Sequence, residues 1–210
     1  MTGLFVAVLA VQLRGSRYVP AIYWTVVVLI SVVGTLLSDT LVDKLGVGLR
    51  TSSLVFAAGL ALVFLAWWLS ERNLSVHSIT TTRRELFYCG AILLTFASGT
   101  STGDLVGESF GLGYGISALV FAGLIALTAL AYYAFKVNGV LAFWIAYILT
   151  RPLGASMGDL LAQSPKDGGL GIGTTLTSAV FLAIIVGLVT YLSRTGADEI
   201  AAARAERRAA

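Results

Sequence analysis

Charged residues are scarce in this sequence. Only 12% of its 210 residues are charged, whereas a soluble domain usually carries about 25%. Together with 57% hydrophobic residues and a mean hydropathy of +0.88, this shortage argues against a water-soluble fold. The single cysteine, Cys89, excludes a disulfide within the chain, and the single histidine, His77, excludes a metal centre with several histidine ligands.

Long uncharged stretches take the place of the missing charges. Five of them are about as long as the 20 or so residues that cross the hydrocarbon core of a bilayer: 18–38, 51–70, 86–103, 109–135 and 168–193. A sixth stretch, 137–150, continues through Arg151 to Gly158. We therefore expect an all-α, polytopic transmembrane helix bundle with about six full spans, surrounded by the lipid bilayer.

The first 13 residues form a shorter apolar stretch. Its apolar part, 2–13, is too short to cross a membrane alone, and it lacks the basic start and the cleavage site of a signal peptide. We interpret residues 1–13 as a partial helix, the end of a truncated first repeat. Whether a homo-oligomer or a missing N-terminal unit completes the bundle stays open.

The sequence contains three copies of one pattern in register. Each copy ends its first apolar stretch on an aspartate, with a glycine five residues before it and a serine or glycine immediately before it. The three sets are Gly34, Ser38 and Asp39; Gly99, Gly103 and Asp104; and Gly154, Gly158 and Asp159. A Gly-x-Gly pair then opens the second half of each copy, at Gly46, Gly111 and Gly171. It is either a flexible connector or backbone that lines a cavity.

These copies predict a chain of tandem two-helix units with boundaries at 14–70, 71–136 and 137–193, followed by a tail at 194–210. Ten basic residues fall between units or in the tail, and only Lys44, Arg50 and Lys166 fall within the hairpins of the units. Cytoplasmic loops are enriched in Lys and Arg, so we expect a cytoplasmic C-terminus and hairpins on the outer side.

The small residues before each aspartate are four positions apart and therefore share one helix face. Little bulk on such a face lets a neighbouring backbone approach closely. We expect all six of them, Gly34, Ser38, Gly99, Gly103, Gly154 and Gly158, to serve in helix packing.

Five carboxylates are candidates for binding or translocating a cation: Asp39, Asp43, Asp104, Glu108 and Asp159. An acidic or amide residue, the last being Gln163, follows each repeated aspartate by four positions, which is the same face if the helix continues. Acids at a helix C-terminus are unfavourable unless a cation meets them, and oxygen ligands favour ions such as magnesium or manganese. The alternatives are solvated acids at the interface or caps of a further helical piece.

Arg151 lies inside an expected membrane helix and is followed by Pro152. An ionisable group at such depth is costly, and it predicts an acidic partner. Arg151 is therefore either an internal counter-charge for transport or half of a structural ion pair. We expect Trp24, Trp67, Trp68 and Trp144 to lie largely in aromatic belts at the membrane interface.

The repeat resembles a family of bacterial membrane proteins defined by a tandem repeat of unknown function, often labelled uncharacterised membrane-anchored proteins. Segments 17–20, 143–155 and 169–175 carry the resemblance most closely. It implies two transmembrane segments per unit, typically four units, and a bacterial inner-membrane location, but no established activity. The chain departs from the family pattern in its nearly absent first unit and in Cys89, which replaces the tryptophan of the repeat.

The leading functional hypothesis is a transporter or channel for a small cation, either a metal ion or a cation coupled to protons. The alternative is a non-transporting membrane scaffold or sensor held by interhelical ion pairs. We do not expect an enzyme, a cofactor or a nucleic-acid partner, because His77 lies in a loop on the cytoplasmic side and no phosphate-binding motif occurs.

Overall fold

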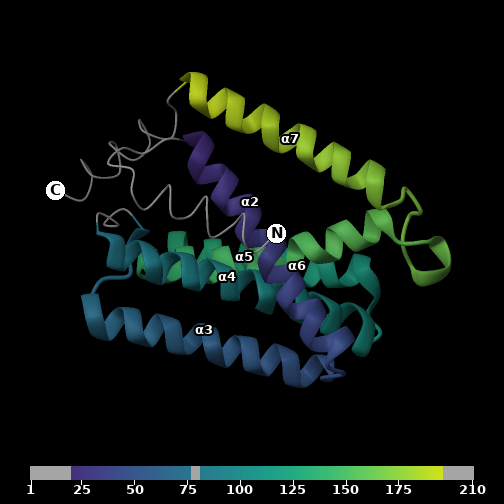
Figure 1. The fold of residues 1–210 in the computed structure, drawn as a ribbon, viewed down its shortest axis with the longest axis horizontal. Coiled ribbons are helices and arrows are strands. Elements are labelled where there is room, and N and C mark those ends of the chain that lie inside the picture. The colour runs from purple at the N-terminus through teal and green to yellow at the C-terminus, as the bar shows by residue number, and fades with distance from the viewer. Residues whose placement is uncertain (1–19, 77–80, 196–210) are drawn as a thin grey trace.

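The computed structural model describes residues 20–76 and 81–195, and these residues form an all-α bundle without strands (Figure 1). This confirms the predicted fold class. The long helices are α2 (Pro20–Asp39), α3 (Leu49–Glu71), α4 (Thr82–Asp104), α5 (Gly113–Phe135), α6 (Gly139–Ala162) and α7 (Thr174–Thr195). The expected partial helix at 1–13, His77 and nearly all of the tail lie outside the described residues.

Five of these helices, all except α4, are long and apolar enough to cross a membrane. The 23-residue α4 has the necessary length but contains many serine, threonine and glycine residues. Because α4 packs against α2, α3 and α6, its small polar side chains face other helices. The central position of α4 thus explains why one of the six expected spans is less apolar than the others.

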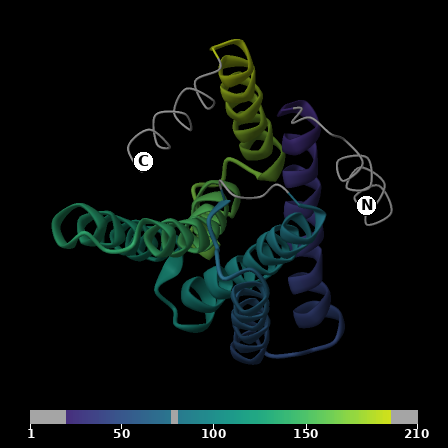
Figure 2. The same ribbon diagram turned by 90° about the vertical axis from the view of Figure 1, so that its left-hand side faces the viewer.

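The helices of neighbouring units pack in a fixed order. The first helices of the three units, α2, α4 and α6, lie against one another in succession, as the end-on view shows (Figure 2). Each second helix lies against the first helix of the following unit, so that α3 packs on α4 and α5 packs on α6. Interfaces between units therefore hold the bundle together more than contacts within them.

Two π-helical turns follow the first helices of units one and two. The turns η1 (Thr40–Lys44) and η3 (Leu105–Ser109) begin directly after Asp39 and Asp104. Their i→i+5 bonds run from the Leu45 amide to the Thr40 carbonyl, 3.2 Å, and from the Phe110 amide to the Leu105 carbonyl, 3.0 Å. The third unit instead continues α6 to Ala162 and follows it with the short 3-10 helix η4 (Pro165–Asp167).

The Gly-x-Gly pairs act as connectors in units one and two. Gly46 and Gly111 both have a φ of +66°, a left-handed conformation that glycine adopts without strain. No described atom lies within 4 Å of the Cβ position of either glycine. These two glycines therefore turn the chain between the two helices of a unit.

An aromatic cluster joins α3, α4 and α6 at the end of the bundle opposite the hairpins. Trp67 and Trp144 pack edge to face with ring centroids 5.8 Å apart, and their side chains are only 0% and 4% exposed. These two tryptophans lie near the expected ends of their helices, but they fill the space between helices and do not face the surroundings as belt residues do. Trp68 is 44% exposed, as a belt residue would be, and the side chain of Trp24 lies outside the described ones.

Candidate functional site

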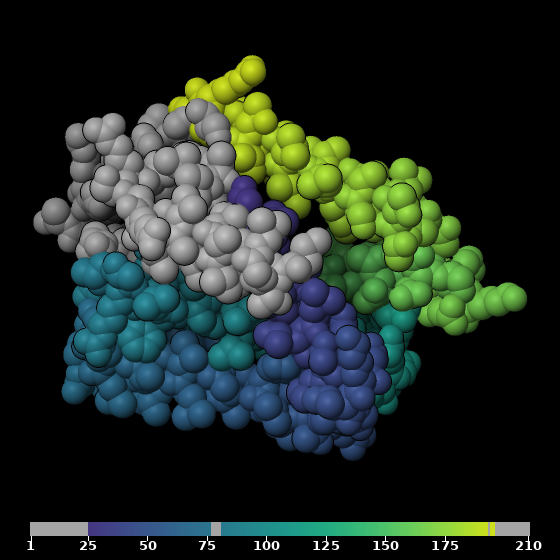
Figure 3. Space-filling view, in the orientation of Figure 1, coloured from purple at the N-terminus to yellow at the C-terminus, as the bar shows by residue number. Residues whose placement is uncertain are grey.

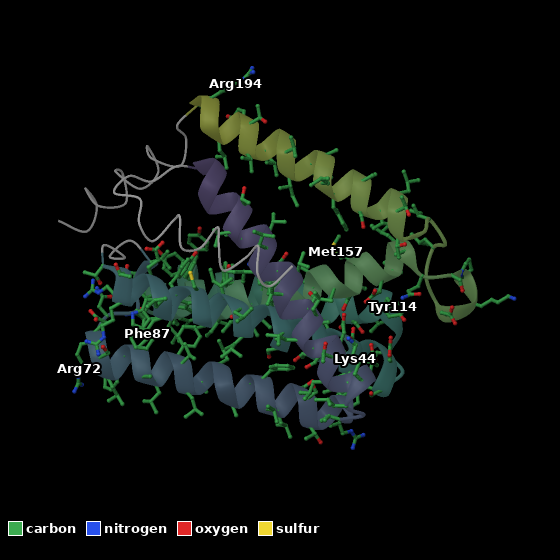
Figure 4. The ribbon with its side chains drawn as sticks, in the orientation of Figure 1. Lys44, Arg72, Phe87, Tyr114, Met157 and Arg194 are labelled. Atoms are coloured by element: carbon green, nitrogen blue, oxygen red, sulfur yellow. The ribbon has the colours of Figure 1, made fainter. Side chains whose placement is uncertain are left out.

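The three repeated aspartates lie at one end of the bundle. Asp39 and Asp104 are the last residues of α2 and α4, and Asp159 lies in the last turn of α6. All three are half-buried. Figure 4 shows Lys44 and Tyr114 at this end and Arg72 at the opposite end. We call this the acidic end of the bundle.

Asp104 is the electrostatic centre of the acidic end. Its carboxylate interacts with those of Asp159, Glu108, Asp39 and Asp43, in decreasing order of strength. These carboxylates come from all three units, and Asp159 also interacts with Glu108. The structure thus brings the five candidate carboxylates into one electrostatically connected group.

The acids four residues after Asp39 and Asp104 are more exposed than the aspartates themselves. Asp43 and Glu108 lie in the π-helical turns, which continue the helical backbone past Asp39 and Asp104. Each of these acids interacts with the aspartate four residues before it, as the repeat pattern predicts. The Tyr114 hydroxyl donates a hydrogen bond of 3.3 Å to Oε1 of Glu108. In unit three, the backbone amide of Gln163 donates a hydrogen bond of 2.9 Å to the Asp159 carbonyl.

The carboxylates of the acidic end do not form a ready-made metal cage. Within residues 20–76 and 81–195, no group of three His, Cys, Asp or Glu side chains is placed to hold a metal ion. No basic side chain of these residues forms an ion pair with the five carboxylates either. The acidic end is therefore a diffuse negative region in which no described basic side chain pairs directly with a carboxylate, although Lys44 lies at the same end.

Arg151 is not paired with an acid in the part of the chain that the structure describes, so the predicted acidic partner is wrong there. Its guanidinium carbon lies 3.7 Å from the ring centroid of Phe96 and 4.7 Å from that of Tyr147. Its Nη2 donates a hydrogen bond of 2.6 Å to the Tyr147 hydroxyl, while its Nε is buried without a partner. Aromatic faces on α4 and α6 thus take the place of the carboxylate, because cation–π attraction stabilises an arginine without a counter-charge.

Three of the six small residues permit close contacts between first helices. A Cβ at Gly34 would lie 2.6 Å from Cβ of Phe96, and a Cβ at Gly99 would overlap Cβ of Arg151. A Cβ at Gly103 would lie 3.1 Å from that of Ala155. Ser38, a fourth, is fully buried.

Gly154 and Gly158 do not have the packing role expected of them in this structure. No described atom lies within 4 Å of either Cβ position. The reason is their position in the repeat. The first helices α2 and α4 each pack against the first helix of the following unit, whereas no described first helix follows α6.

The sequence did not predict the hydroxyl contacts between units. Ser53 of α3 and Ser101 of α4 share a buried hydrogen bond of 3.0 Å, and the Thr35 and Thr100 hydroxyls lie 3.4 Å apart between α2 and α4. The serine and threonine residues inside the long apolar stretches could have predicted such contacts, since these hydroxyls form hydrogen bonds between helices in a membrane. Their spacing alone could not say which helices would pair.

Comparison with protein families gives a match over most of the chain. A family model described as Repeat of Unknown Function (DUF347) matches three times in tandem, at residues 22–73, 87–138 and 142–198. Comparisons with curated proteins and with solved structures found no match. The three matched segments correspond to the helix pairs α2 with α3, α4 with α5, and α6 with α7. The chain belongs to this repeat family.

Proposed function

We propose that this protein conducts or transports a small cation across a membrane, and that the acidic end is where the cation is attracted. The observation that carries the proposal is the set of four carboxylates around Asp104, contributed by three units and without a basic partner among the described residues. Rings of Asp and Glu side chains are a known means of cation selectivity.

Helix polarity strengthens this negative potential. Asp43 and Glu108 lie in the π-helical turns that end the first helices of units one and two, and Asp159 lies in the last turn of α6. The unpaired carbonyls at such helix ends already carry about half a negative charge. Acids at such positions are destabilising unless a cation is present. Three units repeat this destabilising placement of an acid. The repetition is consistent with a bound cation that offsets the repulsion.

The cation keeps part of its hydration shell at this position. Three acidic side chains close enough to hold a bare metal ion do not occur among the described residues. Magnesium gives up water reluctantly and is commonly bound through one or two carboxylates. Asp104 and Asp159 would supply such carboxylates, which suits a hydrated divalent ion or a proton better than a tightly caged metal.

Arg151 acts in this proposal as a positive charge deeper in the bundle. It precedes Asp159 by eight residues, which is about 12 Å along an α-helix. A cation that moves inward from the carboxylates approaches this arginine, whose charge raises the barrier to leakage. Phe96 and Tyr147 hold its guanidinium group away from the acids.

The proposed orientation places the acidic end outside a bacterial inner membrane. Arg72, Arg84 and Arg194 lie at or near the opposite ends of their helices. Basic residues favour the cytoplasmic side, so the C-terminus is cytoplasmic in this proposal.

Flux into proteoliposomes tests the proposed transport. We expect Mg²⁺, Mn²⁺ or proton flux above that of empty liposomes, and a loss of about tenfold or more in Asp104→Asn, because a central charge contributes roughly 1.4 kcal/mol or more to cation attraction. Asp167→Asn is the matched control, because Asp167 bonds Ser164 in the hairpin and is not among the carboxylates that interact with Asp104. Equal flux in the wild type and Asp104→Asn would refute the proposal.

The rival proposal is a membrane scaffold or sensor without transport. The ion pair between Arg151 and a carboxylate that such a scaffold was expected to contain does not occur among the described side chains. The buried aromatic cluster and the hydroxyl pairs could still serve such a scaffold. A folded wild type without flux of any of the three ions would favour it.

A further inference from the structure

A groove lies between α5 and α6 at the end of the bundle opposite the acidic end. It has a volume of about 290 Å³, and its lining includes Ala129 and Tyr132 of α5 and Ala142 and Phe143 of α6. Near the turn that joins the two helices, the Tyr132 ring lies 3.4 Å from the Cβ position of Gly139. The groove is therefore narrow at the turn and continues from there along both helices.

The same positions are filled by aromatic rings between α3 and α4. The matched repeats begin at residues 22, 87 and 142, so each α5 residue corresponds to the α3 residue 65 positions earlier, and each α6 residue to the α4 residue 55 positions earlier. The counterparts of Ala129, Tyr132 and Ala142 are Phe64, Trp67 and Phe87. These three rings stack, because the Trp67 centroid lies 6.4 Å from each of the other two. Figure 4 shows Phe87 at the same end of the bundle as Arg72.

Two alanines in place of two phenylalanines thus open the groove. Trp67 is 0% exposed within its ring stack, whereas Tyr132 is 44% exposed. The missing rings would belong to α5 and α6 themselves. This difference between the two helix pairs therefore does not depend on where the chain begins or ends, or on what lies beyond these helices.

The position and length of the groove fit one leaflet of a bilayer. Among the described elements, α5 packs chiefly on α6 and η3. It lies on the side of the bundle away from α2 (Figure 2), behind the face that α2, α3 and α7 form in Figure 3. The α5 lining runs from Ile125 to Tyr133, which is about 12 Å along a helix, and the hydrocarbon of one leaflet is roughly 15 Å thick.

The charge beside the groove is positive. No acidic residue occurs between Glu108 and Asp159, and Lys136 lies in the turn that joins α5 to α6. Its side chain is exposed and forms no ion pair with the described residues. Basic residues at a membrane surface attract anionic lipids, and tyrosines near the headgroups present both an apolar ring and a hydroxyl. Tyr132 and Tyr133 line the groove three to four residues before Lys136.

We propose that this groove binds an acyl chain of a phospholipid with an anionic headgroup, and that the phosphate of this lipid lies beside Lys136. The acyl chain takes the place of the two rings that Ala129 and Ala142 lack. The inference requires that the chain lie in a membrane, but it does not require transport. Lipid binding can therefore fail while cation flux is observed, and the reverse.

Lipid titration tests the headgroup. The full chain, purified in detergent, is titrated with phosphatidylglycerol and with phosphatidylcholine, and native mass spectrometry measures the bound lipid. The wild type should bind phosphatidylglycerol about fivefold more tightly, and Lys136→Gln should bind both lipids equally. Lys166→Gln is the matched control and should keep the preference, because Lys166 follows α6 at the acidic end. Equal binding by the wild type, or a preference that persists in Lys136→Gln, would overturn the proposal.

Filling the groove tests the acyl chain. Ala129→Phe with Ala142→Phe restores the rings found between α3 and α4, so it should fold with at least the thermal stability of the wild type and bind phosphatidylglycerol about tenfold more weakly. Ala122→Phe with Ala126→Phe is the control, since both alanines are exposed on α5 and neither lines the groove. Unchanged affinity in the filled groove, or equal losses in both double variants, would contradict the proposal. A wild-type dimer that dissociates when the groove is filled, without any loss of lipid, would assign the groove to a protein partner instead.

Discussion

Gly99 of α4 lies in direct contact with the backbone of Arg151 in α6. No side chain fits between them, because a Cβ at Gly99 would overlap Cβ of Arg151 and approach its carbonyl carbon to 3.3 Å. This contact places the arginine beside α4 and brings its guanidinium group onto the ring of Phe96. The absence of a side chain at Gly99 thus allows Arg151 to lie against α4.

Gly99→Ala should destabilise the folded protein by about 1–3 kcal/mol, because the added methyl group forces α4 and α6 apart. Thermal unfolding of detergent-purified protein measures the effect. Gly123→Ala, with open space at its Cβ position, should change stability little. A Gly99→Ala protein as stable as the wild type would show that the contact is not as close as described.

The stacking of Arg151 on Phe96 should appear as a coupling energy of about 0.5–2 kcal/mol. A double-mutant cycle with Arg151→Met and Phe96→Leu, followed by chemical unfolding in detergent, isolates it. Methionine keeps most of the apolar volume and removes the charge. Additive effects of the two substitutions would contradict the cation–π contact.

Ser101→Ala should destabilise the bundle by about 0.5–1.5 kcal/mol, because it leaves the buried Ser53 hydroxyl without its partner. The repeat itself provides the control. Ser156 is the counterpart of Ser101, but its buried hydroxyl has no partner, since the position of Ser53 is Ala118 in the preceding unit. Ser156→Ala should therefore be neutral or stabilising in the same unfolding assay, and an equal loss in both variants would argue against the hydroxyl pair.

Trp144→Ala should cost about 3–5 kcal/mol, because its ring packs on Trp67 and its Nε1 donates a hydrogen bond of 2.9 Å to the Leu74 carbonyl. Trp68→Ala should cost much less, since this ring is exposed. Brominated lipids provide an independent measurement: Trp68→Phe should remove most of the quenchable fluorescence of the described tryptophans. Strong quenching that persists in Trp68→Phe but disappears in Trp144→Phe would show that the Trp144 ring is exposed to lipid, and it would contradict the buried position of this ring.

Glu108→Gln should slow cation flux by about two- to fivefold at low ionic strength and have little effect in 0.5–1 M salt. Glu108 is exposed, so its attraction for a cation is screened over roughly 3 Å at 1 M salt. The half-buried Asp104 is screened less, so Asp104→Asn should remain impaired at both salt concentrations. Flux measured against ionic strength separates the two, and a salt-independent defect in Glu108→Gln would contradict its outer position.

The helices could be predicted from the sequence because the patterns that indicate them involve only residues that are close together in the chain. Long uncharged stretches and a pattern ending in Gly34, Gly99 or Gly154 specify spans and repeats without knowledge of their neighbours. The gathering of carboxylates around Asp104 was also accessible, since the repeat places an aspartate at the same end of each first helix.

Tertiary neighbours decided what the sequence could not. Trp67 and Trp144 have the composition of belt residues, yet packing between α3, α4 and α6 buries them. The partner of Arg151 was mistaken because an aromatic face replaces a carboxylate without any signal in the spacing. The π-helical turns after Asp39 and Asp104 likewise follow no composition rule that distinguishes them from an ordinary helix end.

The second helix of a unit packs on the first helix of the following unit, and this has a consequence for folding during synthesis. Since α3 packs on α4 and α5 on α6, each hairpin emerges from the ribosome before the helix that will cover it has been synthesised. The second helix of a unit therefore stays without its main packing partner until the first helix of the following unit has been synthesised. Assembly therefore runs from the N-terminus to the C-terminus one step behind synthesis, and a chain interrupted between units would leave its most recent helix unmatched.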